Sequence, residues 1–69
     1  MPAGTVIANG GQVTADVPCS LEQFLREQNL LPRSLVVEHN GEAVAPSEFG
    51  RREVRDGDRL EIVRIVAGG

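Results

Sequence analysis

Two Asn-Gly pairs, at residues 9–10 and 40–41, each separate two short runs that are rich in valine and alanine. Asn and Gly readily adopt the positive φ angles of a two-residue hairpin turn, so each pair predicts two adjacent antiparallel strands. After the first pair, apolar residues alternate with polar ones, which is typical of a strand with one buried face. The sequence therefore predicts hairpins over residues 5–17 and 35–45.

One helix is predicted between the two hairpins, over residues 21–28. Ser20 is followed three residues later by Gln23, which is the capping-box pattern of a helix start. The apolar residues that share one face of this helix are Leu21, Phe24 and Leu25. We expect that face to pack on the sheet.

The last strand is predicted over residues 59–66, the longest β-branched run, after a turn at Asp56-Gly57-Asp58. Residues 47–55 lack clear periodicity, which favours a one-turn helix and an irregular connection. The element order is β-β-α-β-β-β, the order of the α+β class and of the ubiquitin-like β-grasp fold with a mixed sheet. A chain of 69 residues has room for one core, so we expect one domain over residues 1–67.

Gly68 and Gly69 follow the last strand directly and end the sequence. A glycine pair costs backbone entropy and adds no packing, so it contributes little to a fold. It does form a slender end that can pass through a narrow opening. We predict that residues 68–69 are a flexible tail with a function; the alternative is a frayed end without function.

Alternation along the last strand predicts an exposed apolar surface beside that tail. Leu60 and Ile62 share one face, so regular alternation places Val63 and Ile65 on the opposite face. Either a bulge shifts the phase or these two side chains are exposed, and we favour exposure. The predicted partner-binding residues, all next to the tail, are Val63, Ile65, Val66 and Ala67.

Composition excludes several classes of function. The net charge of −3 and the lack of aromatic residues among basic clusters argue against nucleic acid as a ligand. The basic residues are all arginine, so the chain offers no lysine for a Schiff base or for self-conjugation. A single cysteine, Cys19, excludes an internal disulfide and a multi-cysteine metal site, and no apolar run is long enough to cross a membrane. We expect a cytoplasmic protein that binds no metal.

A few other residues could suggest chemistry, and each has a simpler interpretation. Cys19 is expected to be a half-buried residue before the helix cap, and His39 a solvated side chain before a turn. The Asp56-Gly57-Asp58 segment lacks the other ligands of a calcium loop, so we interpret it as a turn. The Arg51-Arg52 pair is expected to lie in a solvated loop.

The second half of the chain resembles the ThiS sulfur carriers of thiamine biosynthesis, relatives of the MoaD carriers. The residues that carry the resemblance are Val36, Asn40-Gly41, Val44, Pro46, Phe49, Val54, Asp56-Gly57-Asp58, the run 60–63 and the end 66–69. The resemblance spans nearly the whole chain and is most specific from about residue 35 onward.

The resemblance implies a carrier cycle and not an enzyme. An adenylating E1-like enzyme of the ThiF type would use ATP to activate the Gly69 carboxylate, which then becomes a thiocarboxylate. A thiazole synthase would accept the sulfur. No cofactor would be bound stably, and Gly68 with Gly69 would be the functional site.

Three alternatives remain open from the sequence. The sulfur could go to molybdopterin, a tRNA or a secondary metabolite, because the accepting enzyme makes that choice. The chain could instead be a ubiquitin-like protein modifier that Gly69 joins to target lysines. A third possibility is a pure binding module that uses its sheet edge, in which case the tail is dispensable.

Overall fold

The structure is a computed structural model that describes residues 3–65 of the 69-residue chain. Its strands are β1 (Gly4–Ala8), β2 (Gly11–Ala15), β3 (Cys19–Ser20), β4 (Leu35–His39), β5 (Glu42–Val44), β6 (Glu53–Val54) and β7 (Arg59–Arg64). Its helices are α1 (Leu21–Glu27) and two single-turn 3₁₀ helices, η1 (Pro32–Ser34) and η2 (Pro46–Glu48).

Five strands form one mixed sheet in the order β2-β1-β7-β4-β5. The two predicted hairpins are present, and their turns have the expected geometry: Asn9 and Asn40 have φ angles of 50° and 51°. The glycines that follow have φ angles of 83° and 86°, which residues with a side chain rarely adopt. Strand β7 lies at the centre, parallel to β1 and antiparallel to β4.

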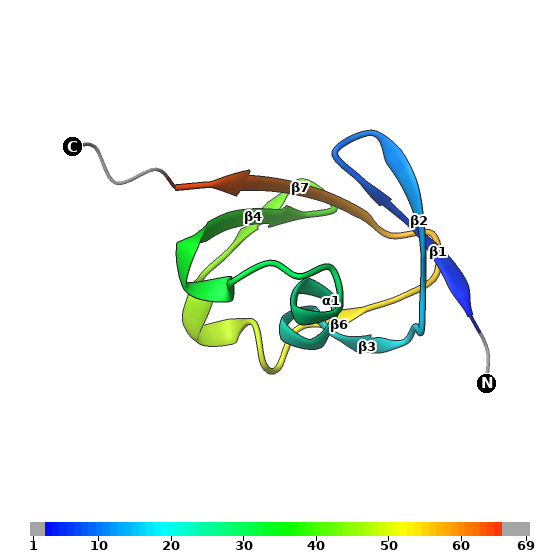
Figure 1. Ribbon diagram of the computed structural model, residues 1–69, viewed down its shortest axis with the longest axis horizontal. Coiled ribbons are helices and arrows are strands. Elements are labelled where there is room, and N and C mark those ends of the chain that lie inside the picture. Colours follow the sequence, from blue (N-terminus) through cyan, green and yellow to red (C-terminus); the bar gives the residue numbers. More distant parts are fainter. Residues whose placement is uncertain (1–2, 66–69) are drawn as a thin grey trace.

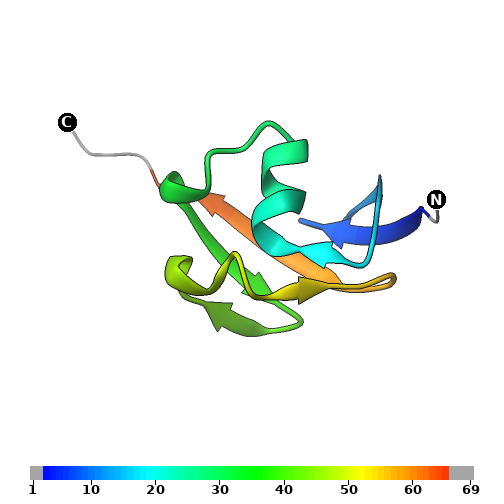
Figure 2. The same cartoon turned by 90° about the horizontal axis from the view of Figure 1, so that it is seen from below.

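Helix α1 lies across one face of this sheet, as Figure 1 and Figure 2 show. It begins where predicted, because the Ser20 hydroxyl accepts a hydrogen bond of 3.0 Å from the Gln23 backbone N–H. Its three predicted apolar residues are all buried. Asn29 follows the helix with a φ angle of 62°, a left-handed conformation that commonly ends helices.

The hydrophobic core lies between α1 and the sheet. Its buried members are Val6, Ala15, Val17, Leu21, Phe24, Leu25, Leu35, Val37, Val44, Phe49, Val54 and Leu60. They come from both hairpins, the helix, the last strand and the connecting segment that contains Phe49 and Val54. The predicted α+β class and mixed sheet are therefore confirmed.

The sequence prediction missed one small feature, the two-stranded sheet of β3 and β6. Each of these strands has two residues, which is too short for alternation to appear in the sequence. The single-turn helix expected after residue 45 is present as η2. Strand β2 ends at Ala15 and not at residue 17. Strand β7 ends at Arg64, whereas the predicted strand extended to residue 66, which lies outside the described residues.

Candidate functional site

Strand β7 carries the candidate site at its far end, beyond the part that β1 covers. The Ile65 backbone N–H donates a 2.7 Å hydrogen bond to the Ser34 carbonyl, so the antiparallel pairing with the β4 side continues one residue past the strand. The end of the described chain is therefore held against Ser34, the last residue of η1. Residues 66–69, which include the predicted tail, follow this position in the sequence.

The side chains of Val63 and Ile65 are exposed, as the alternation predicts. Val63 is 61% exposed and Ile65 53% exposed. The pairing of β4 with β7 runs without interruption from Leu35 opposite Arg64 to His39 opposite Leu60, so no bulge shifts the phase. Exposure was the correct alternative of the two.

Val36 extends this apolar surface and was missed in the sequence analysis. It lies directly opposite Val63 in the register and is 51% exposed. The signal was available, because Leu35 and Val37 are buried on the other face and alternation places Val36 between them on the outer face. We call Val36, Val63 and Ile65 the outer patch.

Two carboxylates lie beside the outer patch on the same face of the sheet. Glu38 and Glu61 are exposed and directly opposite each other, and they form the next pair on the outer face after Val36 and Val63. Like charges in opposed positions destabilise a sheet slightly. The arrangement gives the outer patch an acidic border, which favours a partner with basic residues.

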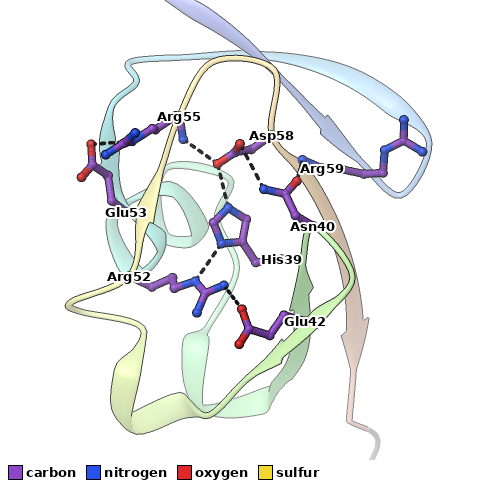
Figure 3. A network of polar contacts seen from close by, with 8 residues as sticks. All are labelled: His39, Asn40, Glu42, Arg52, Glu53, Arg55, Asp58 and Arg59. Carbon is purple, nitrogen blue, oxygen red and sulfur yellow. Dashed lines mark hydrogen bonds and ion pairs between the residues drawn. The ribbon is translucent and has the colours of Figure 1, made fainter.

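A second cluster of side chains is built around His39, and it is structural (Figure 3). His39 is 6% exposed. Its Nδ1 accepts a 2.8 Å hydrogen bond from Arg52 Nε, and its Nε2 lies 2.7 Å from an oxygen of Asp58. Because Arg52 can only donate, Nδ1 is the acceptor of this bond and the Nε2–H donates to Asp58. Both ring nitrogens are occupied, so His39 is not available as a catalytic base.

Two sequence expectations are corrected by this cluster. His39 is buried and not solvated, because its partners come from the β6 and β7 segments and close over it. Arg52 is not a free loop residue, since its guanidinium also donates a 2.6 Å hydrogen bond to Glu42 and its side chain is 25% exposed.

The carboxyl groups of the cluster respond to these hydrogen bonds. Burial by itself would raise the pKa of Asp58, but hydrogen bonds from His39, the Arg55 backbone N–H and Asn40 outweigh it and lower the pKa. The hydrogen bond from Arg52 lowers the pKa of Glu42. Both groups are therefore held in their charged form.

Cys19 is half-buried before the helix cap, as expected. Burial, together with the negative charges of Glu27 and Asp16, raises the pKa of its thiol. A raised pKa keeps the sulfur protonated and unreactive at neutral pH. A sulfur-holding role for this residue is not favoured.

The remaining expectations concern metal ions and membranes. Within residues 3–65, the acidic, histidine and cysteine side chains form no group that could hold a metal ion. Asp56 acts in a turn, where it accepts a 2.7 Å hydrogen bond from the Thr5 N–H. Over the same part of the chain, no helix is long and apolar enough to span a membrane.

Four of the predicted site residues, Val66, Ala67, Gly68 and Gly69, lie outside the described residues. Their roles remain predictions. The same holds for the division into a domain over residues 1–67 and a tail over 68–69.

Comparisons with known proteins agree with the fold and identify the family. The model of the ThiS family matches residues 6–69. The chain therefore belongs to the ThiS family, and the resemblance to ThiS-type sulfur carriers is confirmed.

One curated relative is a thiazole synthase from Paramagnetospirillum magneticum. It is 34% identical over 64 residues, which cover 93% of this chain. The match covers 20% of the relative, so this chain spans about a fifth of that protein's length.

Two solved structures are similar in three dimensions. The crystal structure of the thiamine biosynthesis protein ThiS from Geobacter metallireducens has a TM-score of 0.80 and 26% identity, covering 94% of this chain and 99% of that one. A designed protein based on human erythrocytic ubiquitin has a TM-score of 0.52 and 21% identity, covering 100% and 98%. The second likeness shows the fold alone. Together they confirm the ubiquitin-like β-grasp fold.

Proposed function

We propose that this protein carries sulfur as a thiocarboxylate on Gly69 and delivers it for thiazole formation in thiamine biosynthesis. The observation that carries the proposal is the family match, which extends from residue 6 through the glycine pair to residue 69. The central strand of the sheet leads directly into that segment.

The proposed chemistry needs no catalytic group from the carrier. A carboxylate is a poor electrophile, so a ThiF-type adenylating enzyme joins the Gly69 carboxylate to the AMP part of ATP and releases pyrophosphate. The terminal sulfur of a persulfide then attacks the acyl carbon, and AMP leaves. A thiol cleaves the resulting acyl disulfide, and the thiocarboxylate remains on Gly69.

The outer patch is the proposed docking surface for the partner enzymes. Val36, Val63 and Ile65 are exposed apolar side chains that lie where the described chain ends. Burial of such a surface contributes to binding without any change in the core. In this proposal Val66 and Ala67 continue the contact toward Gly69.

The proposed sulfur acceptor is a thiazole synthase. Support comes from the relative in Paramagnetospirillum magneticum, which carries that name and matches this chain over a fifth of its own length. The thiamine name of the similar Geobacter protein agrees with this acceptor.

An adenylation assay with the ThiF-type enzyme tests the proposal. Deletion of Gly69 shortens the reach by about 3.5 Å, which leaves the carboxylate short of the nucleotide. Gly69→Val keeps the length but adds a β-branched side chain on the Cα next to the reacting carboxyl carbon. We expect ATP-dependent adenylation to fall at least about 100-fold in both variants, because the reacting carbon is misplaced or crowded.

Thermal unfolding is the control for the assay. Both variants are expected to unfold within about 2 °C of the wild type, because substitutions away from a core change stability little. Equal adenylation of all three chains would contradict the proposal.

A further inference from the structure

Strand β7 has one edge that β4 does not use. Toward β4, Arg59 accepts a 2.8 Å hydrogen bond from the Asn40 N–H, and the Ile65 N–H donates to Ser34 at 2.7 Å. These bonds fix the alternation of the antiparallel ladder: odd-numbered residues of β7 direct their backbone groups toward β4. The even-numbered residues direct theirs toward the other side, where β1 lies.

Asn9 marks the point at which β1 stops covering that side. Its backbone N–H donates a 2.9 Å hydrogen bond to the Leu60 carbonyl. Its side chain then bonds both backbone groups of Ile62: the amide oxygen accepts from the N–H at 2.7 Å, and the amide nitrogen donates to the carbonyl at 3.0 Å. The Asn9 side-chain amide thus makes the two hydrogen bonds to Ile62 that the backbone of a further β1 residue would make. The chain then turns into β2.

The next even-numbered residue is Arg64, which this pairing leaves uncovered. Strand β1 pairs with β7 only at Arg59 and Leu60, and Asn9 covers Ile62. Within residues 3–65, no hydrogen bond reaches the Arg64 N–H or carbonyl from that side. In Figure 1, β7 continues past the hairpin of β1 and β2.

An open hollow adjoins this edge. It has a volume of about 440 Å³, and its lining includes Ala8, Phe24, Leu30, Leu35, Ile62 and Arg64. Asn9 and Gln28 complete the lining, and five of its eight residues are apolar. An apolar side chain from a neighbouring strand can contact these five residues beside the unpaired backbone groups.

The geometry points to strand addition at Arg64: an extended segment of the thiazole synthase pairs with the N–H and carbonyl of this residue. This inference rests on the proposed function. The Arg64 N–H and carbonyl are spaced as in any strand, so the backbone of another extended segment can hydrogen-bond to both. One side chain of that segment then enters the hollow. The relative that matches this chain over a fifth of its length is itself a thiazole synthase, which favours that partner. The outer patch begins at the adjacent Val63, so both contacts fit one interface.

A pair of substitutions at position 64 tests the inference. Arg64→Pro removes the N–H and places a ring on the open edge, while Arg64→Ala removes the side chain and keeps the N–H. The Arg64 N–H points away from β4, so proline removes no hydrogen bond of the sheet, and proline is tolerated at such edge positions. Val63 is already in a strand, the conformation that a residue before proline prefers.

The measurement is the dissociation constant of the 69-residue chain with the thiazole synthase of the same organism, by titration calorimetry. Arg64→Ala is expected to bind within about threefold of the wild type, and Arg64→Pro at least about tenfold more weakly than Arg64→Ala. Equal binding by the two variants would overturn the inference and leave the proposed function intact. A wild-type chain that does not bind the synthase would contradict the proposed acceptor and the inference with it.

Amide hydrogen exchange of the wild-type chain gives a second readout that needs no variant. In the free protein the Arg64 N–H is expected to exchange faster than the hydrogen-bonded Ile65 N–H. On binding to the synthase, the Arg64 N–H is expected to slow at least about tenfold. An Arg64 N–H that exchanges equally fast in the complex would overturn the inference.

Discussion

His39 shows how single residues fix the end of the sheet at which β7 begins. Its ring lies between Arg52 of the segment before β6 and Asp58 of the turn before β7. Asn40 adds a hydrogen bond from its side chain to Asp58 and accepts one from the Arg59 N–H. Two turns and a connecting segment are thereby held together by side chains that leave no ring nitrogen of His39 unsatisfied.

Acid sensitivity follows from Asp58. Because hydrogen bonds lower its pKa in the folded protein below the ordinary value of 3.8, its contribution to stability is present above about pH 4. That contribution is lost as the pH falls through the lowered folded pKa. We expect Asp58→Asn to reduce the unfolding free energy at pH 7 by about 1–2 kcal/mol.

Denaturant unfolding between pH 2 and pH 7 checks this expectation. The difference between wild type and Asp58→Asn should shrink toward the acid end. Asp16→Asn, at an exposed carboxyl that makes no side-chain hydrogen bond within residues 3–65, is the matched control and should remain close to the wild type throughout. A difference that stays constant with pH would contradict the role of Asp58.

Gly4 is required by close packing and not by its φ angle. A Cβ atom at this position would lie 2.5 Å from Val17 Cγ2 and 2.7 Å from an oxygen of Asp56. Gly4→Ala is therefore expected to lower the unfolding free energy by about 1–3 kcal/mol.

Gly11→Ala is the control for Gly4→Ala, because its new Cβ would meet only the Ala8 carbonyl oxygen at 3.6 Å. It should be neutral or stabilising by up to about 1 kcal/mol. Thermal unfolding of both variants distinguishes the two sites. Equal stability of the two variants would show that the contacts of Gly4 adjust without cost.

At the scale of elements, the register between β4 and β7 determines which of their side chains lie on the inner face of the sheet and which on the outer face. Leu35, Val37 and Leu60 point into the core, while Val36 and Val63 meet on the outer face. A charge on the outer face should therefore affect binding and not packing. A charge on the inner face would disrupt the core.

Val63→Asp tests this separation. We expect a loss of affinity for the ThiF-type enzyme of at least about tenfold, because a central apolar contact is replaced by a solvated charge. The unfolding free energy should fall by about 1 kcal/mol or less, the range of strand propensity. Calorimetric titration and thermal unfolding give the two quantities.

Leu31→Asp is the matched control, since Leu31 is 74% exposed but lies before η1 and outside the outer patch. It should bind within about threefold of the wild type. If Val63→Asp unfolds the protein, or binds as well as Leu31→Asp, the outer patch is not the docking surface.

Patterns of neighbouring residues in the sequence predicted most helices and strands. The features that the sequence did not predict depend on contacts between residues that are distant in the sequence. The Asn-Gly turns, the Ser20 cap and the exposure of Val63 depend on neighbouring residues. The burial of His39 depends on partners 13 and 19 residues away, which no local pattern reveals. The Asn9 side chain reaches Ile62 across 53 residues, so the open edge at Arg64 was equally beyond prediction from sequence.

In the molecule as a whole, the two ends of strand β7 lie beside features with different roles. It starts beside the His39 cluster, which stabilises the fold, and it ends at the outer patch and the open edge of Arg64. The core lies along its buried face between these ends. The described chain therefore ends on a strand that β4 pairs from Leu60 to Arg64 and that β1 and the Asn9 side chain cover only as far as Ile62.

Intact mass spectrometry tests the central claim most directly. The 69-residue chain is incubated with the ThiF-type enzyme, ATP and a persulfide donor, and fragmentation locates any change in mass. Replacement of one carboxylate oxygen by sulfur adds about 16 Da, and we expect this increase on the C-terminal fragment that contains Gly69, only when ATP is present. An unchanged mass under these conditions, or an increase located at Cys19, would contradict the account.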